Sequence, residues 1–479
     1  MKGAMLIFLI SVACLFASVQ CKNRDPLRDL LKGHMNKRSE TYAVVEEAST
    51  DYSPVYMAPQ DGLKEADKIM GLPGQPQVSF LQYSGYVTVD PTAGRALFYW
   101  LTEAEDPSTK PLVLWLSGAP GCSSIGYGAM TELGPFRVNA DGKTLWYNDK
   151  AWNTVANVLF LESPAGVGFS YSDTASDYVT GDTKTAADSY TFLVNWLERF
   201  PEYKTRDFYI AGESYAGHYV PQLAQLILKT NKMPNQTVIN LKGIAIGNAY
   251  IDYLDVLRGS IDFYWSHALI SDESRDEIVK YCNFSSPILS DQCKQVLEQT
   301  YGESGNIYTF DIYAPLCGSN STLPSPSTFD PCSDDYVFAY LNTPEVQQAL
   351  HVNITGALPG PWTSCSDLID WTDSPYSVLP VIKELMANGI NVWIYSGDTN
   401  GVVAVTTTTR YSMAKLGAPI KTPWYPWYYQ GEVGGYAVGY ENVTFITIRG
   451  SGHFLPSYQP GRAITFFSSF LEGKLPPSS

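Results

Sequence analysis

The sequence predicts an α/β fold with a central, mostly parallel β-sheet flanked by helices. Six short apolar runs, rich in β-branched and aromatic residues, have the length of buried parallel strands, and most are followed by Gly, Ser or Asp. Helical patterns, with apolar residues at i, i+3, i+4 and i+7, lie between several of these runs. Strands that alternate with helices favour a sheet covered on both faces. The six runs are Leu112–Leu116, Val158–Leu161, Phe208–Ala211, Ile244–Ile246, Val392–Tyr395 and Val443–Ile448.

The alternation breaks down over about residues 253–375, which we interpret as a helical cap inserted into the α/β unit. This stretch contains five of the six cysteines expected in the mature chain. It also contains a segment rich in Pro and Ser, residues 318–331, of the kind that is exposed and open to proteolytic nicking. The sequence leaves open whether that segment is excised.

The composition indicates a folded, acidic protein of 479 residues. Hydrophobic residues make up 45 % and charged residues 17 %, which excludes a mostly disordered chain. Lys and Arg number 32 against 48 Asp and Glu, a net charge of −16, so nucleic-acid binding is not expected. Because there are five His and no Cys-x-x-Cys motif, we expect neither zinc nor another cofactor.

Residues 1–21 have the features of a secretory signal peptide. Lys2 precedes an apolar run from Ala4 to Ala17, which is shorter than the about 20 residues that span a bilayer, and small residues follow it. No later run of 18 apolar residues occurs, so we expect no membrane association after the signal is removed.

Residues 22–67 form a separate N-terminal segment. Its first half is polar and basic and contains the dibasic pair Lys37–Arg38. A flexible linker and a propeptide account for this composition equally well.

Two kinds of covalent modification are expected in a secreted chain. Cys14 lies in the apolar run and Cys21 near its cleavage site, which leaves six cysteines and suggests three disulfides among fifteen pairings. Five Asn-x-Ser/Thr tripeptides make some glycosylation expected. The six cysteines are Cys122, Cys282, Cys293, Cys317, Cys332 and Cys365, and the tripeptides begin at Asn235, Asn283, Asn320, Asn353 and Asn442.

The strongest chemical signal is a predicted strand that runs into Gly212-Glu-Ser-Tyr-Ala-Gly217 and is followed by a helical pattern. A Ser at a sharp strand–helix turn is the nucleophile elbow of the α/β-hydrolase fold, and small residues on both sides permit the tight turn. The segment departs slightly from Gly-x-Ser-x-Gly, because Ala216 occupies the fifth position. This pattern makes Ser214 the candidate nucleophile.

A nucleophilic Ser needs a base and an acid, which this fold supplies from loops after later strands. His453 follows the strand Val443–Ile448 in a Gly-rich loop, whereas His218 lies on the helix after the Ser and cannot easily reach its hydroxyl. Asp398 follows the strand Val392–Tyr395. The order Ser, Asp, His predicts a triad in which His453 accepts the Ser214 proton and Asp398 holds the imidazole.

The tetrahedral intermediate formed by such a Ser needs two backbone donors. One is expected from Tyr215, the residue after the nucleophile, and the other from the loop after an early strand. That loop, Ser117–Ser124, is rich in small residues, and the N–H of Ala119 is our candidate for the second donor.

These motifs resemble those of the serine carboxypeptidase family, and in particular its plant class II members. The resemblance covers roughly residues 68–475, which we take as the catalytic domain with its cap. It implies release of C-terminal amino acids from peptides and proteins at acidic pH, in a vacuole or outside the cell. The matching segments are Trp115–Ser124, Glu162–Ser170, Gly212–Gly217, Tyr395–Asp398 and Gly450–His453.

The resemblance also implies a site for the free carboxylate of the substrate. Two acidic side chains can bind a third carboxylate only if they share protons, since like charges in close contact raise a pKa, and this accounts for an acidic working range. By motif position the site comprises Trp115, Ser117, Gly118, Glu132 and Glu213, and the implied disulfides are Cys122–Cys365, Cys282–Cys293 and Cys317–Cys332.

The chain departs from the family pattern where Ser117-Gly118-Ala119 replaces the usual Asn-Gly-Gly. Ser117 offers one hydroxyl instead of an amide, so a second function stays open: acyl transfer from a glucose ester to an alcohol on the same scaffold. A hydroxynitrile lyase and a binding protein without activity fit less well, because the elbow and the triad are intact. The preferred C-terminal residue and any homodimer formation are not decided by the sequence.

Overall fold

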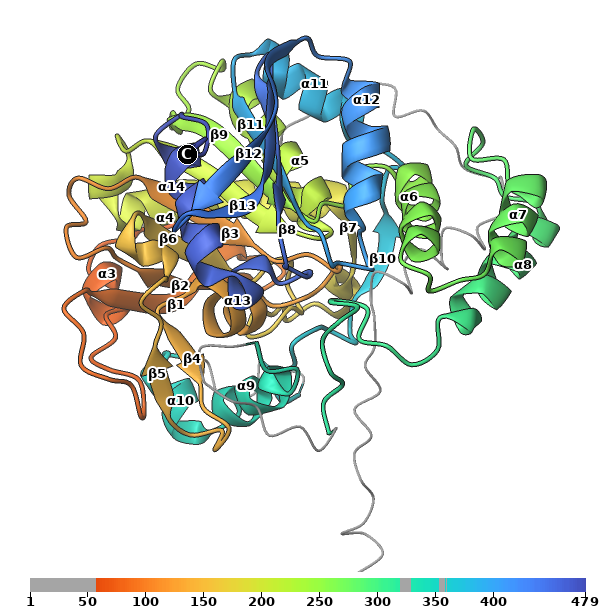
Figure 1. The fold of residues 1–479 in the computed structure, drawn as a ribbon. Helices are drawn as coiled ribbons and strands as arrows, with labels where there is room; N and C mark the ends of the chain where they lie inside the picture. Colours follow the sequence, from red (N-terminus) through yellow and green to blue (C-terminus); the bar gives the residue numbers. More distant parts are fainter. Residues whose placement is uncertain (1–56, 319–328, 353–357, 359) are drawn as a thin grey trace, which may run out of the picture.

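A mixed β-sheet forms the centre of the molecule in the computed structural model, which describes residues 57–318, 329–352, 358 and 360–479 (Figure 1). The predicted signal peptide, most of the N-terminal segment, Asn320 and Asn353 lie outside the described residues. Ten described strands follow the order β1-β2-β6-β3-β8-β9-β11-β14-β13-β12. Their bounds are β1 Gln82–Asp90, β2 Arg95–Thr102, β3 Leu112–Leu116, β6 Asn157–Leu161, β8 Phe208–Glu213, β9 Leu241–Gly247, β11 Asn391–Gly397, β12 Ile420–Tyr429, β13 Glu432–Tyr440 and β14 Val443–Ile448.

The six predicted strands are the six consecutive central ones, from β6 to β14, and every neighbouring pair among them is parallel. This confirms the predicted fold class. The outer strands are different: β1 and β2 pair antiparallel at one edge, and β12 and β13 pair antiparallel at the other. The sequence analysis did not predict these four strands.

Helices cover both faces of the sheet, and the side chains of β3 show how. Leu112, Leu114 and Leu116 join a core with helices α4 (Asp182–Arg199), α5 (Ala216–Thr230) and α11 (Leu379–Ala387). The alternate residues Val113 and Trp115 join a second core with helices η1 (Ser124–Leu133), α13 (Leu455–Tyr458) and α14 (Pro460–Leu471). Successive residues of a strand point to opposite faces, so one strand contributes to both cores. Together these layers form an α/β-hydrolase fold.

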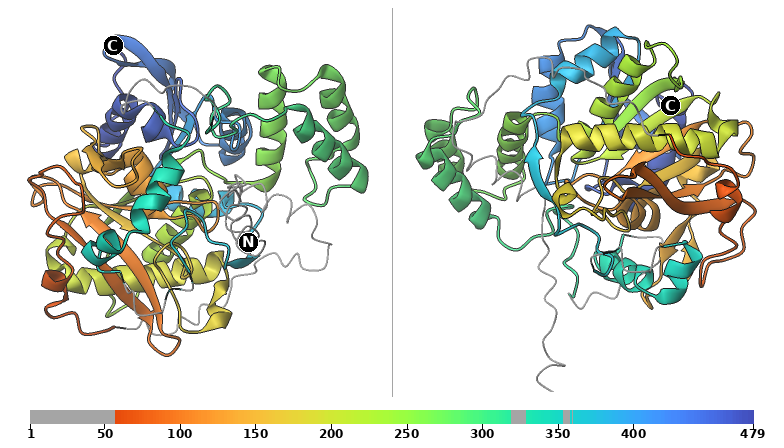
Figure 2. Two further views of the ribbon diagram at one scale, coloured as in Figure 1. Left: turned by 90° about the horizontal axis from the view of Figure 1, so that it is seen from below. Right: turned by 180° about the vertical axis from the view of Figure 1, so that it is seen from behind.

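The inserted cap is divided into two parts. Helices α7 (Asp272–Tyr281) and α8 (Asp291–Glu303) pack on each other beyond α6 (Tyr253–Ser266), and Figures 1 and 2 show this pair standing away from the sheet. Helices α9 (Ser333–Leu341) and α10 (Pro344–Ala349) lie elsewhere, with α9 against η1. The strand β10 (Asp370–Asp373) then pairs in parallel with β7 (Val179–Gly181), which joins the end of the cap to the core.

One hairpin and six short helices complete the described secondary structure. The hairpin β4 (Phe136–Val138) and β5 (Leu145–Tyr147) follows η1. Short helices occur at α3 (Leu63–Ala66), η2 (Trp152–Thr154), η3 (Ala175–Tyr178), η4 (Pro201–Tyr203), η5 (Thr407–Ser412) and α12 (Met413–Leu416).

One disulfide joins the cap to the core, and two lie within the cap. Cys122–Cys365 joins the loop after β3 to the cap, Cys282–Cys293 links α7 to α8, and Cys317–Cys332 closes a loop before α9. These are the pairs that the resemblance implies. Within the described residues, no helix combines the length and apolar character of a membrane span, and no group of acidic, His and Cys side chains is arranged to hold a metal ion.

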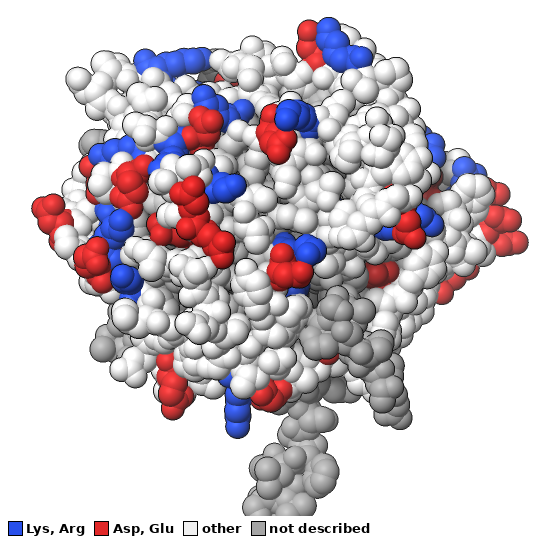
Figure 3. Space-filling model, turned by 60° about the vertical axis from the view of Figure 1, so that its left-hand side comes forward, with Lys and Arg blue, Asp and Glu red and all other residues white. Residues whose placement is uncertain are grey.

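Acidic and basic side chains are interspersed on the face of the molecule drawn in Figure 3, and no large basic area appears there. Many of the described charged residues form ion pairs with a neighbour, such as Lys421 with Glu441 and Arg462 with Glu432. On this face the excess of acidic residues is therefore spread out.

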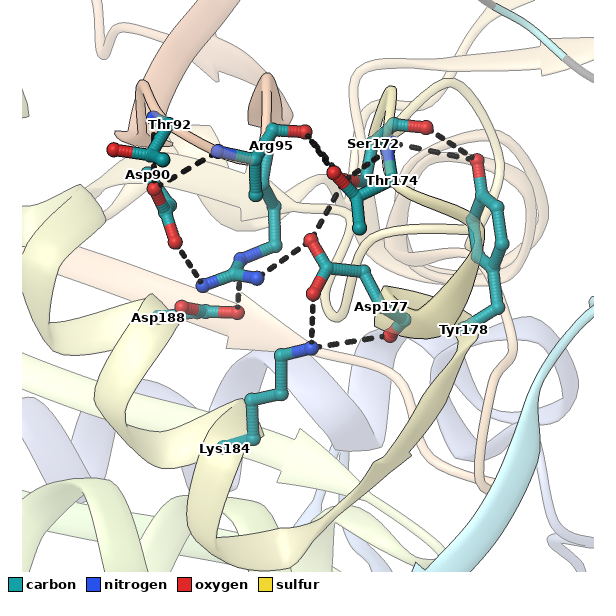
Figure 4. Close-up of polar contacts among 10 residues, drawn as sticks. Asp90, Thr92, Arg95, Ser172, Thr174, Asp177, Tyr178, Lys184 and Asp188 are labelled. Carbon is teal, nitrogen blue, oxygen red and sulfur yellow. Dashed lines mark hydrogen bonds and ion pairs between the residues drawn. The ribbon is translucent and has the colours of Figure 1, made fainter.

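A denser ionic cluster lies where β2 meets the start of α4 (Figure 4). The guanidinium of Arg95 pairs with Asp90 at 3.3 Å, Asp177 at 2.6 Å and Asp188 at 2.9 Å, and Lys184 also binds Asp177 at 2.7 Å. Burial raises the pKa of Asp188 to about 6, although the positive charge of Arg95 opposes that shift. Arg95 therefore compensates carboxylates that are largely removed from water.

We predict that Arg95→Ala lowers the free energy of unfolding by about 3 kcal/mol, because it leaves buried carboxylates without their cation. Lys421→Ala is the control: its ion pair with Glu441 is exposed, and its loss changes stability by less than about 0.5 kcal/mol. Urea unfolding at neutral pH measures both. Equal effects of the two substitutions would contradict the prediction.

Candidate active site

The candidate nucleophile, acid and base lie beyond the carboxyl ends of the central strands, which we call the site edge of the sheet. The hydrogen-bond ladder of the parallel strands continues one residue past each strand end. Ser214 N–H donates to Gly247 O at 2.9 Å, and Asp398 N–H donates to Ile448 O at 3.2 Å. Between them, the residue that follows β9 donates to β11 in the same way. The loop after β14 then carries His453 to this edge.

Ser214 lies in a tight turn between β8 and α5, with a left-handed backbone conformation at φ 63°. The small residues around it are required by close contacts. A Cβ on Gly212 would come within 2.5 Å of Leu116 O, and one on Gly217 within 2.4 Å of Tyr250 O. The turn therefore has the geometry expected of a nucleophile elbow.

Asn248 is a residue of this edge that the sequence analysis missed. It is fully buried after β9, and its Nδ2 donates to His453 O at 2.6 Å while its Oδ1 accepts Gly397 N–H at 2.9 Å. Asn248 therefore links the loop that carries His453 to β11, the strand that precedes Asp398. The available signal was a polar residue directly after a buried strand, the signal that identified Asp398.

His453 is buried, and its backbone N–H donates to Phe310 O at 2.6 Å. The ring centroids of Phe310 and His453 are 5.2 Å apart. Its Nδ1 has no hydrogen-bond partner among the described residues, and burial lowers the pKa of the imidazole to about 3. At mildly acidic pH this imidazole is consequently neutral.

Asp398 does not bond to His453 in this structure, although the sequence analysis predicted that it holds the imidazole. Its Oδ1 instead accepts Gly450 N–H at 2.7 Å, at the start of the loop that carries the histidine. Burial raises the pKa of Asp398, and these backbone contacts oppose the shift. Asp398 is thus bonded to the start of the loop that carries His453, and not to the imidazole ring.

The loop after β3 packs directly against the elbow. A Cβ on Gly118 would lie 2.3 Å from Tyr215 N, and Ala119 next to it has the left-handed φ of 96°. Within the described part of the chain, the N–H groups of Ala119 and Tyr215 make no hydrogen bond. Both are therefore available to an oxyanion, as an oxyanion hole requires.

The disulfide Cys122–Cys365 holds this loop to the cap. Hydrogen bonds reinforce it, since Ser123 N–H donates to Ser364 O at 2.8 Å and Ser366 N–H donates to Gly121 O at 2.9 Å. The candidate oxyanion loop is consequently anchored on both sides, by the elbow and by the cap.

Two buried carboxyl groups lie beside the elbow. Glu213 immediately precedes Ser214 at the end of β8, and Glu132 lies beside Glu213 on η1. Glu213 is 3 % exposed and Glu132 is 1 % exposed. Burial raises the pKa of Glu132 to about 7, whereas burial and the charge of Glu132 together raise the pKa of Glu213 well above its usual range. The pair is therefore protonated at acidic pH.

Trp115 lies in β3 and Ser117 directly follows it, beside the strand β8 that ends at Glu213. The indole N–H of Trp115 donates to Ser117 Oγ at 3.1 Å, and Ser117 N–H donates to Ser124 Oγ at 2.9 Å. The Trp115 ring packs on η1, since a Cβ on Gly128 would lie 2.3 Å from its Nε1. The Ser117 hydroxyl is thus oriented by Trp115 within the loop that precedes Ala119.

Comparisons with known proteins assign the chain to a family. The family model described as serine carboxypeptidase matches residues 73–473. Serine carboxypeptidase-like 40 of Arabidopsis thaliana is 54 % identical over 437 residues, which is 88 % of this chain and 86 % of the relative. Serine carboxypeptidase 24 of the same plant is 50 % identical over 439 residues, which is 87 % of this chain and 94 % of the relative.

A solved structure supports the fold. Kex1, a prohormone-processing carboxypeptidase from Saccharomyces cerevisiae, superposes with a TM-score of 0.71 at 22 % identity, covering 87 % of this chain and 97 % of Kex1. The matched family model spans most of the chain and includes every strand of the central sheet. The chain therefore belongs to the serine carboxypeptidase family.

Proposed function

We propose that this protein is a serine-type carboxypeptidase that releases C-terminal amino acids from peptides and proteins and works best at mildly acidic pH. The observation that carries the proposal is the buried pair Glu132 and Glu213 beside the elbow of Ser214. A site that binds the terminal carboxylate of the substrate beside the nucleophile places the last peptide bond of the substrate at Ser214.

The reaction begins when Ser214 Oγ attacks the carbonyl of that bond and His453 accepts the hydroxyl proton. The N–H groups of Ala119 and Tyr215 stabilise the oxyanion. The imidazolium then protonates the leaving amine, and water hydrolyses the acyl-enzyme. Asp398 stabilises the imidazolium once the ring of His453 turns its Nδ1, which has no partner among the described residues in this conformation, towards the carboxylate.

The substrate carboxylate is held by hydrogen bonds from protonated acids. Below a pH of about 7, Glu132 is neutral and donates its proton, and Glu213 does the same. Ser117 contributes a hydroxyl, and Gly118 lets the loop pack against the elbow, where a Cβ would lie 2.3 Å from Tyr215 N. Trp115 keeps the Ser117 hydroxyl in place.

The acidic working range follows from opposite shifts in pKa. His453 remains a neutral base above its pKa of about 3, and Glu132 remains a neutral donor below its pKa of about 7. Both conditions hold between those values. Three disulfides fit the oxidising secretory pathway, and hence an extracellular or vacuolar location.

The direct test compares an N-blocked dipeptide with its C-terminal amide. We predict release of free amino acid from the dipeptide only, because the amide lacks the carboxylate that the acids bind. Ser214→Ala should lower kcat by at least about 10³-fold, and the surface control Ser79→Ala should leave it unchanged. Transfer of an acyl group from a glucose ester, without dipeptide hydrolysis, would replace the proposal with the acyltransferase function.

The role of Glu132 predicts a pH-dependent KM. As the pH rises through about 7, Glu132 ionises and repels the substrate carboxylate, so KM should rise about tenfold between pH 6 and pH 8. In Glu132→Gln the amide stays neutral, and this rise should become smaller. Steady-state kinetics with the blocked dipeptide measure it.

Glu345→Gln is the matched control, since Glu345 is exposed on α10 and its loss should leave the wild-type profile intact. A KM that is flat across this range in the wild type, or an unaltered rise in Glu132→Gln, would contradict the assignment of Glu132.

A further inference from the structure

The side chain of Tyr215, the residue after the candidate nucleophile, is held by a polar network that the proposed chemistry does not use. Tyr215 is fully buried, and its hydroxyl donates to Asp182 Oδ1 at 2.8 Å. The indole N–H of Trp371 donates to the same phenol oxygen at 3.2 Å, and the Ser374 hydroxyl is also bonded to it. The far end of the side chain is therefore fixed by three groups.

Asp182 is in turn held by α5, the helix that begins just after Tyr215. Its Oδ2 is bonded to His218 Nδ1 at 2.8 Å and accepts Gln222 Nε2–H at 2.6 Å. The His218 ring stacks on the Tyr215 ring, with centroids 4.8 Å apart and planes 26° from parallel. Asp182 and His218 are 2 % and 0 % exposed, so water does not compete for these bonds.

His218 has no access to the reaction from this position. Its Nδ1 is committed to Asp182, and its Nε2 is buried without a hydrogen-bond partner in the described part of the chain. The ring is thus held by Asp182 at one nitrogen and has no protein partner at the other within the described residues. The geometry of this second His–Asp pair is therefore suited to holding Tyr215 rather than to proton transfer at Ser214.

The network also joins the cap to the elbow. Asp182 follows β7, whereas Trp371 belongs to β10 of the cap and Ser374 follows that strand. The two strands pair in parallel, with Trp371 opposite Thr180. The ionic cluster of Figure 4 secures the approach to β7, because Asp177 is bound by Arg95 and Lys184. Groups from the core and from the cap thus bind the same phenol oxygen of Tyr215.

We propose that Asp182 and His218 are positioning residues for the oxyanion donor at Tyr215. The backbone N–H of Tyr215 must point at the developing oxyanion, and a displacement of about 1 Å can cost about 10²-fold in rate. A side chain fixed at its hydroxyl and stacked along its ring fixes the Cα and N–H to which it is attached. The inference rests on the proposed nucleophile Ser214 but not on a peptide substrate.

Tyr215→Phe tests the proposal, because it removes the hydroxyl and keeps the ring and the backbone N–H. We expect the second-order rate constant for labelling of Ser214 by a fluorophosphonate to fall at least about tenfold. On a blocked dipeptide, kcat should fall similarly while KM stays within about twofold. Ser374→Ala, which removes a cap residue from the same oxygen, should give a smaller fall in both rates.

Tyr99→Phe is the matched control. Tyr99 lies on β2, away from the elbow, and is fully buried. Its hydroxyl donates to the carboxylate of Asp67 at 2.5 Å. This substitution should lower the melting temperature and leave the labelling rate unchanged. If Tyr215→Phe and Ser374→Ala both label at the wild-type rate, with only a loss of thermal stability, the positioning role is overturned.

Rescue by a conservative variant separates positioning from bulk packing. Asp182→Asn keeps an oxygen that accepts the Tyr215 hydroxyl, so it should retain more of the labelling rate than Asp182→Ala. Equal rates in the two variants would overturn the proposal. Labelling requires no peptide: if the wild type labels but does not hydrolyse dipeptides, the carboxypeptidase function fails while the rates of these variants still decide the positioning role.

Discussion

The registered ends of the parallel strands β8, β9, β11 and β14 are the constraint on which the rest of this structure depends. The backbone ladder continues past each strand, so that Ser214 is bonded to β9 and Asp398 to β14. A slip of one residue in any pair would turn alternate side chains to the other face and separate these groups. Asn248 adds a side-chain clamp between the same strands, which makes the sheet edge and the candidate site one hydrogen-bonded unit.

Burial gives this unit its chemistry by shifting acids and base in opposite directions. Removal from water favours the neutral form of each group, which lowers the pKa of His453 and raises those of Glu132 and Glu213. The same physical cause therefore produces a neutral base and neutral donors in the same acidic range. The cap contributes to it, since its residue Phe310 contacts the histidine loop through both backbone and ring.

Much of this architecture could be predicted from local patterns. The six central strands are short and continuously apolar because both of their faces are buried, and a polar residue follows the strands that end at the site. Two of the four outer strands were missed for a physical reason: β12 carries two prolines and mostly half-exposed or exposed side chains, and β13 is rich in glycine, so neither shows a buried-strand pattern. β12 is the last strand of the sheet, and it tolerates prolines because one side of its ladder is unpaired.

The contacts within the site were less predictable than its members. Chain order indicated Ser214, Asp398 and His453, but not that Asp398 would bond to Gly450 in this conformation. Sequence reasoning excluded His218 as a base through its place on the helix, yet only the three-dimensional arrangement shows its partner Asp182, 36 residues earlier. Pairings between distant segments depend on how loops fold back, and no local pattern encodes them.

The central claim is that Ser214, His453 and the two backbone donors converge on a single reacting carbon. A crystal structure of the protein covalently modified by a peptidyl phosphonate tests it most directly. The account predicts a bond from Ser214 Oγ to phosphorus, the phosphonyl oxygen within hydrogen-bond distance of Ala119 N and Tyr215 N, and His453 rotated to within bonding distance of Asp398. Attachment to another residue, or an oxygen that faces away from both N–H groups, would contradict it.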